Sequence, residues 1–385
     1  MTVILDDQSN DPGTHVLLIG VGDYPFLKDG SAPPQNAFDL HMDLGQLPSP
    51  PISLSEVATW FCDDQHGFHN PPRPLRSLQV LASAATPLEW VHPNEAKHTI
   101  QRATMANVQQ AINDWKSRAD RNPENLCVLY FCGHGLSFGE SQNSLLMEDF
   151  GRNQNNPMQG AIAIDKLHLG MRVQCQAKYQ CYFVDACRNS PSNAFITRFG
   201  TETGDQVIAG GLSKNIRDKA APIFFATQLA AAAYGFADQP SLFTQGLLRC
   251  FRGVGSRDAD DHWEVTVAAV AEGVNKCVES LAFQTQPQFC QPRDTGVSFM
   301  LHRLRADPEV VVKVFMRDAQ LLPTTMLVHV CETTNEEDSR EPLNMPWWLP
   351  VRLGHHRFKA IAKPGDQLIN ERTRFVAPPS AEVGL

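Results

Sequence analysis

The sequence predicts an α/β fold with a mostly parallel central sheet, followed by a small all-β module of sandwich type. Compact apolar runs bounded by loop residues recur up to about residue 300, and segments with helical spacing separate them. Beyond Asp307-Pro308 the apolar runs become short, Pro, Gly or acidic loops divide them, and no helical spacing is present. A chain of 385 residues has room for one large domain and one small one.

The larger part of the chain alternates between predicted strands and predicted helices. Short apolar runs between loops are typical of buried strands, and we expect them at 15–21, 78–81, 126–130, 182–184 and 222–227. Helices are expected at 35–47, 104–115, 164–169, 241–252 and 265–282. The second of these segments, 104–115, shows the signal clearly, because Thr104 can cap it and Val108, Ile112 and Trp115 share one face.

The predicted domain boundaries follow from these patterns. Residues 1–13 are polar and contain Pro and Gly, so we expect a flexible N-terminal tail. Residues 14–304 form the α/β domain. Residues 307–385 form the β-rich module, whose strand-like runs lie at 310–316, 325–330, 350–353 and 356–362.

Composition excludes several classes of protein. A formal net charge of −9 without a long basic run argues against nucleic-acid binding. No stretch of eighteen apolar residues is present, and the N-terminus lacks the features of a secretory signal, so we expect neither a membrane span nor export. Several of the ten cysteines lie inside strand-like or helix-like runs, which favours free thiols in a reducing, cytoplasmic compartment.

Two short motifs carry the chemistry. Gly133-His134-Gly135 and Asp185-Ala186-Cys187 each end an apolar run that reads as a strand of the parallel sheet. The carboxyl ends of parallel strands lie at one edge of a sheet, so His134 and Cys187 can meet there. A thiol nucleophile needs such a base, and the backbone N–H groups of Gly135 and Cys187 could stabilise an oxyanion. The alternative is an inert buried thiol beside a hydrogen-bonded histidine, which would be favoured for either residue alone.

At these residues the chain resembles the caspase-like cysteine peptidases of family C14, which include metacaspases and paracaspases. The shared features are a strand ending in Gly-His-Gly and a later strand ending in Asp-x-Cys, together with the first-strand turn at Tyr24 and the segments 145–149 and 225–248. The resemblance covers about residues 14–304. It implies an α/β/α sandwich, a Cys187–His134 dyad and hydrolysis of peptide bonds in protein substrates.

The resemblance also implies a substrate preference. Asp39 and Asp185 match acidic residues that line the primary specificity (S1) pocket of metacaspases and paracaspases. Two carboxylates there favour Arg, then Lys, before the cut, because the Arg fork matches a carboxylate. The alternative is that Asp185 is a structural cap and Asp39 a solvated charge. A third acidic residue of paracaspases is replaced by Gly235.

No cofactor is expected to be required. Many metacaspases need calcium, and Asp149 and Asp165 match two of their acidic positions, but Lys166 replaces a neighbouring acid, so the calcium site is incomplete. Cys62, His66 and His69 lack a second pair at zinc spacing and are expected to form a structural loop.

Two functions of different class stay open. In the first, the chain is an endopeptidase held inactive until triggered, either by itself or by an upstream activating protease or regulatory partner. The basic, glycine-containing segment 188–221 offers cleavage sites at Arg198, Lys214 and Arg217. In the second, the chain is an adaptor that docks a partner through its C-terminal β module, although an adaptor would have no need of both His134 and Cys187. The absence of a targeting signal is compatible with a prokaryotic protein.

Overall fold

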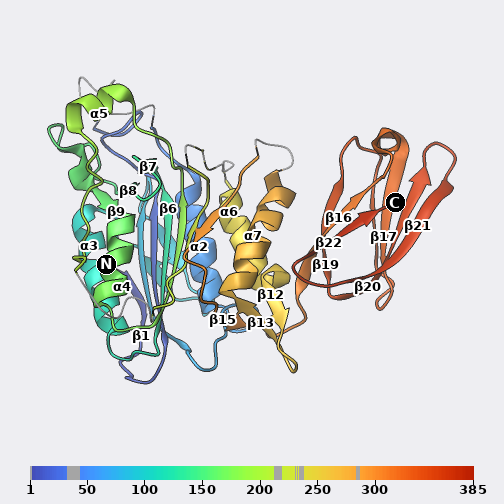
Figure 1. Cartoon of the computed structure of the whole chain (residues 1–385), viewed down its shortest axis with the longest axis horizontal. Helices are drawn as coiled ribbons and strands as arrows, with labels where there is room; N and C mark the ends of the chain where they lie inside the picture. Colours follow the sequence, from blue (N-terminus) through green and yellow to red (C-terminus); the bar gives the residue numbers. More distant parts are fainter. Residues whose placement is uncertain are drawn as a thin grey trace. The chain divides into compact units, whose positions relative to one another are not determined.

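The computed structural model describes residues 2–32, 44–211, 219–229, 231, 233, 238–282 and 287–385 (Figure 1). Two compact units are present. The first takes the chain up to Gln245 together with Gln288–Phe299, and the second takes Gly246–Pro287 together with Met300–Leu385. This grouping differs from the boundary at 304–307 expected from the sequence, because α7 (Val267–Ala282) belongs to the same unit as the C-terminal strands. The sequence-based boundary stays a prediction.

A seven-stranded sheet forms the centre of the first unit. Its strand order is β1-β3-β2-β6-β10-β11-β14. The strands are β1 Thr2–Asp6, β2 Thr14–Val21, β3 Leu75–Ser83, β6 Leu126–Gly133, β10 Tyr179–Ala186, β11 Ile223–Phe225 and β14 Gln291–Arg293. The five inner strands run parallel, and only the edge strands β1 and β14 pair antiparallel. The mostly parallel sheet predicted from the apolar runs is therefore confirmed.

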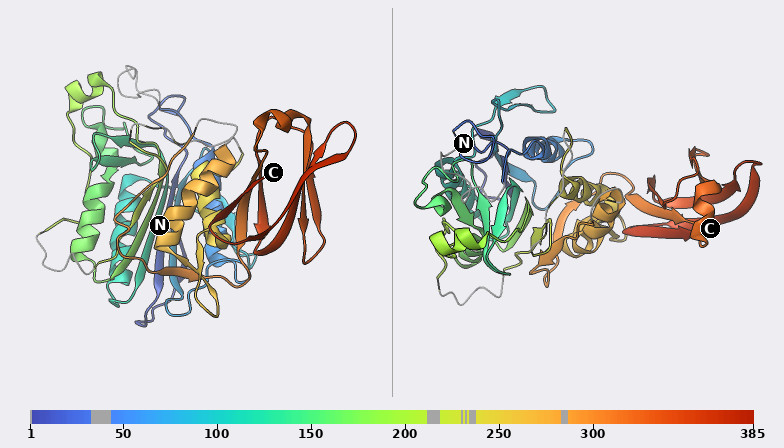
Figure 2. Two further views of the ribbon diagram at one scale, coloured as in Figure 1. Left: turned by 45° about the vertical axis from the view of Figure 1, so that its right-hand side comes forward. Right: turned by 90° about the horizontal axis from the view of Figure 1, so that it is seen from above.

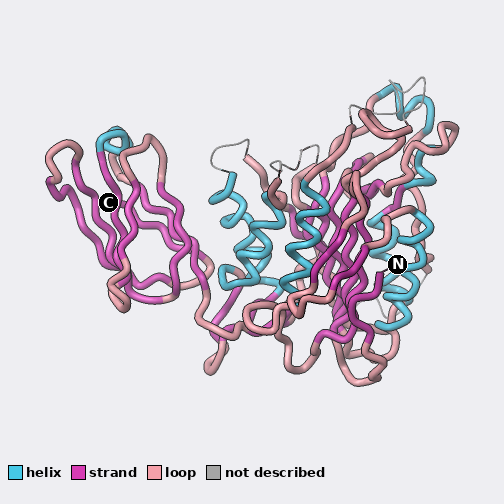
Figure 3. Tube along the Cα trace, turned by 180° about the vertical axis from the view of Figure 1, so that it is seen from behind, coloured by secondary structure: helices cyan, strands magenta, loops and turns pink. Residues whose placement is uncertain are grey.

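Helices cover both faces of this sheet, as Figures 1 and 3 show. Helices α3 (Met105–Ala119) and α4 (Ile164–Gln174) lie on one face, and α2 (Ser49–Cys62) lies on the other. Thr104 caps α3 by accepting a hydrogen bond from the backbone of Asn107, as expected. Since both faces are covered, β2 and β6 are buried along their whole length, which explains their uninterrupted apolar sequence.

A second, smaller sheet of the first unit lies beside the carboxyl end of β6. It contains β7 (Gly135–Ser137), β8 (Asn143–Leu146) and β9 (Ala161–Ala163), none of which is among the strands predicted above. A hairpin of β4 (Glu89–Val91) and β5 (Lys97–Thr99) follows β3. Helix α5 (Asn193–Phe199) lies in the segment that follows β10.

Helix α6 (Leu242–Arg249) begins in the first unit and leads into the second. A π-helical turn (Cys250–Val254) follows it. The strands β12 (Ser256–Asp258), β13 (Trp263–Thr266) and β15 (Met300–Arg303) then form a three-stranded sheet beside α7. None of the helices among the described residues is both long and apolar enough to span a bilayer.

The rest of the second unit is a β-sandwich, seen from two sides in Figure 2. One sheet has the order β19-β16-β22 and the other β18-β17-β20-β21. The strands are β16 Glu309–Phe315, β17 Thr325–Cys331, β18 Glu337–Arg340, β19 Trp347–Arg352, β20 Gly354–Ala362, β21 Gln367–Val376 and β22 Ser380–Gly384. Their inward residues, among them Val312, Leu327 and Phe358, form one core. The predicted C-terminal all-β module is confirmed.

The structure corrects two local predictions. The flexible tail expected at 1–13 is wrong for Thr2–Asp6, which form β1 along the edge of β3, while Arg118 binds Asp6 at 2.7 Å. The fourteen-residue helix α2 is absent from the elements predicted above. The helix predicted at 35–47 falls mostly on residues outside the described part of the chain.

Candidate active site

His134 and Cys187 occupy equivalent positions at the ends of two neighbouring strands. In the pairing of β6 with β10, Cys132 lies opposite Asp185 and Gly133 lies opposite Ala186. His134 directly follows Gly133, and Cys187 directly follows Ala186. Because side chains alternate along a strand, both lie on the side that Cys132 and Asp185 face. The structure therefore brings the two residues together at the carboxyl edge of the sheet.

The hydrogen bonds of His134 define which ring nitrogen carries its proton. Its Nε2 lies 2.7 Å from the carbonyl oxygen of Gly45. A carbonyl oxygen only accepts, so Nε2 is the protonated nitrogen and Nδ1 keeps a lone pair. The backbone N–H of His134 donates to the hydroxyl of Tyr24 at 2.8 Å, and the two rings lie 4.8 Å apart between centroids. Burial lowers the pKa of His134 to about 4, so the ring is neutral at pH 7.

Cys187 is held by the backbone of Ala233. The N–H of Ala233 donates to the sulfur at 3.1 Å, and the sulfur lies 3.8 Å from the carbonyl oxygen of Ala233. Burial raises the pKa of the Cys187 thiol, and the N–H of Ala233 opposes that shift only in part. The Cys187 thiol and the His134 imidazole are therefore both neutral at pH 7.

Both glycines that flank His134 are required by close contacts. A Cβ atom at Gly133 would lie 2.8 Å from the hydroxyl oxygen of Tyr24, and one at Gly135 would lie 2.5 Å from the carbonyl oxygen of Cys187. Any side chain at either position would push His134 or Cys187 out of place. The oxyanion role of the N–H groups of Gly135 and Cys187 stays a prediction.

Asp185, on β10 two residues before Cys187, is buried. Its carboxylate accepts hydrogen bonds from the hydroxyls of Ser241 and Thr244, the latter at 2.7 Å. The thiol of Cys132 and the hydroxyl of Tyr130 also point to it, each at 3.4 Å. Only 3% of Asp185 is exposed, and this burial raises its pKa, while the four hydrogen bonds act in the opposite direction. Cys132 is equally buried and its pKa is raised well above the ordinary value, so it is a poor nucleophile.

The other residue expected in the primary specificity pocket, Asp39, lies outside the described residues, as does Gly235. The structure thus places one of the two predicted carboxylates, and the pairing of Asp39 with Asp185 stays a prediction.

Arg188, directly after Cys187, is buried and anchored by several contacts. Its guanidinium donates to the side chain of Asn143 at 2.9 Å, to the carbonyl oxygen of Glu140 at 3.1 Å and to the side chain of Gln291. It also lies over the ring of Phe225, 4.6 Å from the centroid. With 1% of its surface exposed, Arg188 ties the turn that carries Cys187 to β8, β11 and β14.

The predicted cleavage sites are only partly described. Arg198 is exposed and lies within helix α5. Lys214 and Arg217 lie outside the described residues.

The two acidic residues considered for calcium serve protein hydrogen bonds. Asp149 accepts from the backbone N–H of Met105 at 2.8 Å, at the start of α3, and Asp165 accepts from the backbone of Asn143 at 2.7 Å and pairs with Arg293. Within the described ranges, no three His, Cys, Asp or Glu side chains gather as a metal site would need.

Five contacts at the site are not predicted from the sequence. Tyr24 was noted only as part of a turn, whereas its hydroxyl supports His134. Gly45 and Ala233 act through backbone atoms, and because every residue type has these atoms, the sequence does not identify such contacts. The hydroxyls of Ser241 and Thr244 follow the spacing of one helical turn, a signal that could have been read.

Comparisons with known proteins show what the chain is similar to. The family model described as Peptidase_C14, caspase domain, matches residues 66–296, more than half of the chain and including both motifs. "Uncharacterized protein y4kE" of Sinorhizobium fredii is 28% identical over 284 residues, which are 67% of this chain and 78% of that protein. The crystal structure of caspase-1 from Spodoptera frugiperda covers 75% of this chain and 93% of its own, with a TM-score of 0.40 and 10% identity. The chain belongs to the caspase domain family, Peptidase_C14, and is a cysteine peptidase of that family.

Proposed function

We propose that the chain is a cysteine endopeptidase that uses a His134–Cys187 dyad and cuts protein substrates after Arg and, less efficiently, after Lys. The observation that carries this proposal is the hydrogen bond from Nε2 of His134 to Gly45, which leaves Nδ1 as a base at the strand end next to Cys187. A base oriented by a third group is the arrangement that activates a nucleophile.

In the first half of the reaction, Nδ1 of His134 takes the proton of the Cys187 thiol as the sulfur attacks the substrate carbonyl carbon. The carbonyl oxygen becomes an oxyanion, which the N–H groups of Gly135 and Cys187 stabilise. The C–N bond then breaks, and the imidazolium returns its proton to the departing amine. The products of this half are a thioester on Cys187 and a free amine.

In the second half, His134 removes a proton from water as the water attacks the thioester. The C–S bond breaks, the carboxylic acid product leaves, and the thiol is restored. Neither half consumes a redox equivalent, and the thiol and imidazole supply the nucleophile and the acid–base group. No cofactor is therefore required for the chemistry, and addition of EDTA to the purified enzyme should leave its turnover unchanged.

The preference for Arg rests on Asp185 and Asp39. All four hydrogen bonds received by Asp185 end on its Oδ2. We assign Oδ1 to the guanidinium of the substrate, with Asp39 as the second carboxylate. Arg can donate two parallel hydrogen bonds, whereas the Lys ammonium acts as a point charge, so Arg should be preferred.

Four fluorescence-quenched peptides test this preference. They differ only in the residue before the cut, which is Arg, Lys, citrulline or Asp. Citrulline keeps the shape of Arg but has no charge, so kcat/KM should fall about tenfold or more from Arg to citrulline. The variant Asp185→Asn should reduce that ratio, whereas Asp64→Asn, which changes an exposed carboxyl elsewhere, should not. Efficient cleavage of the Asp peptide by the native chain would contradict the assignment.

A further inference from the structure

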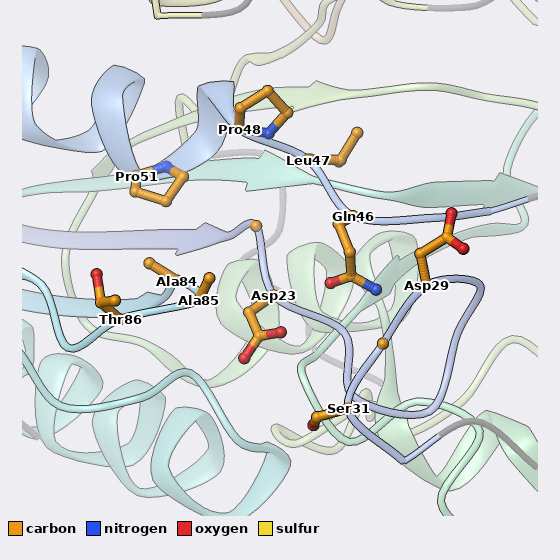
Figure 4. Close-up of a pocket in the computed structure, with 12 residues that line it drawn as sticks. Asp23, Asp29, Ser31, Gln46, Leu47, Pro48, Pro51, Ala84, Ala85 and Thr86 are labelled. Carbon is orange, nitrogen blue, oxygen red and sulfur yellow. The ribbon is translucent and has the colours of Figure 1, made fainter.

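A pocket of about 680 Å³ lies beside the dyad in the first unit (Figure 4). Its walls come from four segments: the end of β2 at Gly22 and Asp23, the turn 29–31, the segment 46–51 that enters α2, and the residues 84–86 that follow β3. Figure 4 shows Asp29 and Gln46 on one side, Ala84 and Ala85 on the other, and Asp23 between them. None of the steps proposed above uses this pocket.

The pocket adjoins His134 through both strand register and hydrogen bonds. In the pairing of β2 with β6, Gly20 lies opposite Cys132, so Gly22 falls one strand away from His134, about 5 Å in a parallel sheet. Gly45, which accepts the hydrogen bond from His134, directly precedes Gln46 of the pocket wall. The side chain of Gln46 in turn holds the backbone of Tyr24 at 2.8 and 3.0 Å.

The order of the strand ends fixes which part of a substrate can reach the pocket. Along the sheet the order is β3, β2, β6 and β10, so the pocket, His134 and Cys187 follow one another. In the proposed function His134 protonates the departing amine, so that amine lies on the His134 side of Cys187. The chain after the cut therefore runs toward β2 and β3. The end of β2 lies two strand spacings of about 5 Å each from the end of β10, and about three extended residues of substrate span that distance.

The charges of the pocket select its occupant. Asp23 and Asp29 are the charged residues that line it, and among its described lining residues none is basic. Arg102 binds Asp23 from outside the pocket wall, but Glu148 also binds that guanidinium, at 2.7 Å, so two carboxylates neutralise it. Leu47, Pro51 and Ala85 add apolar surface that would pack against an aliphatic stem.

We propose that this pocket is a subsite for the leaving side of the substrate, and that it takes Lys or Arg at the second or third residue after the cut. The inference rests on the proposed function for the direction of the substrate. It adds a second basic position to the cleavage motif, so the preferred protein segments would be basic on both sides of the scissile bond.

A binding measurement that needs no turnover tests the subsite. The probes are the fluorescently labelled peptides Gly-Lys-Lys-Gly and Gly-Glu-Glu-Gly, which have a free N-terminus as the leaving product has. Their affinity for the full chain carrying Cys187→Ala is measured by fluorescence anisotropy. The Lys peptide should bind at least about fivefold more tightly than the Glu peptide, and added salt should reduce the difference.

Two pocket variants and two matched controls locate the site. Asp29→Asn removes a charge, and Asn tolerates the positive φ of 59° at this position. Ala85→Trp fills the apolar side of the pocket. Each should weaken binding of the Lys peptide about threefold or more. Asp64→Asn and Ala96→Trp make the same changes at exposed positions away from the pocket and should leave binding unchanged.

Equal affinity for the two peptides, or Lys-peptide binding that survives both pocket variants, would overturn the subsite. Failure of the subsite and failure of the proposed function are distinguishable. Cleavage of Arg peptides regardless of the residues after the cut would leave the endopeptidase standing and remove the subsite. Selective binding of the Lys peptide by a chain that cleaves no Arg peptide would support the pocket as a site for basic peptides and contradict the proposed function.

Discussion

The Nε2 atom of His134 lies 2.7 Å from the carbonyl oxygen of Gly45, so Nε2 carries the proton of the imidazole and Nδ1 keeps its lone pair. Burial lowers the pKa of His134 to about 4 and raises the pKa of Cys187, so both shifts favour the neutral pair over an imidazolium–thiolate pair. The proton then moves only when a substrate carbonyl is present.

The rate of alkylation by iodoacetamide tests whether the Cys187 thiol is neutral. The rate is measured for each cysteine by mass spectrometry between pH 5 and 10. Because only a thiolate reacts, Cys187 should react slowly at neutral pH and accelerate only as the pH rises through its raised pKa. Cys331 is an internal comparison, since hydrogen bonds from Thr334 lower its pKa, and it should react earlier. A flat, fast rate for Cys187 between pH 5 and 8 would show a preformed thiolate instead.

Replacing Arg188 should loosen the turn that carries the nucleophile. Arg188→Ala removes the donor to the side chains of Asn143, which is buried, and Gln291, whereas the carbonyl oxygen of Glu140 still accepts from Arg293. We expect unfolding in urea to show a loss of about 2 to 4 kcal/mol and kcat to fall together with it. Arg198→Ala removes an exposed arginine of α5 and should change stability by less than about 0.5 kcal/mol. Equal stability of the two variants would contradict the anchoring role.

The sequence predicts the central strands and the dyad because both depend on local signals. Runs such as 126–130 are apolar throughout, since helices cover both faces of the sheet, and the motif residues follow those runs directly. Helix α2 escapes prediction because Pro48, Pro50 and Pro51 look like a loop. In the first turn of a helix, however, proline removes no intrahelical hydrogen bond.

Other features depend on the path of the chain and cannot be read locally. Strand β1 has five residues and forms only because the edge of β3 is open to it. The carbonyl of Gly45 reaches His134 across 89 positions of sequence, and any residue type could supply it. Arg188 begins the basic segment 188–221, whose sequence gives no sign of burial, whereas its contacts with Asn143, Gln291 and Phe225 make it part of the core.

Acid should destabilise the first unit through its buried histidines. His15 is enclosed in β2, and burial lowers its pKa to about 4, as for His134. Between the pKa of an unfolded histidine, about 6.5, and pH 4, the unfolded chain binds protons that the folded one does not. Stability therefore falls as the pH drops through that window, by at most about 3 kcal/mol for each histidine.

Urea unfolding at pH 7, 6, 5 and 4.5 measures this loss. The variant His15→Gln should show a shallower decline than the native chain over this range. His66→Gln, at an exposed position, should decline as the native chain does. A native stability that stays constant from pH 7 to 4.5 would contradict the neutral, buried state of His15.

Activation should involve a cut between residues 188 and 221. Arg198 lies in α5, so this helix must unwind before Arg198 can enter an active site. Mass spectrometry of the purified chain incubated with and without calcium, beside the Cys187→Ala variant, should locate new termini in this segment. A fully active preparation whose segment 188–221 stays intact would rule the cut out as the trigger.

The most direct test of the dyad compares turnover of one Arg peptide by the native chain, Cys187→Ala and His134→Ala, with thermal unfolding measured for all three. Each variant should lose about a thousandfold or more in kcat/KM, since nucleophile and base act as one unit, while the midpoint of the Cys187→Ala variant stays close to the native value. Turnover by Cys187→Ala at the native rate would contradict the account, as would a native chain that cleaves no Arg peptide even after the segment 188–221 has been cut.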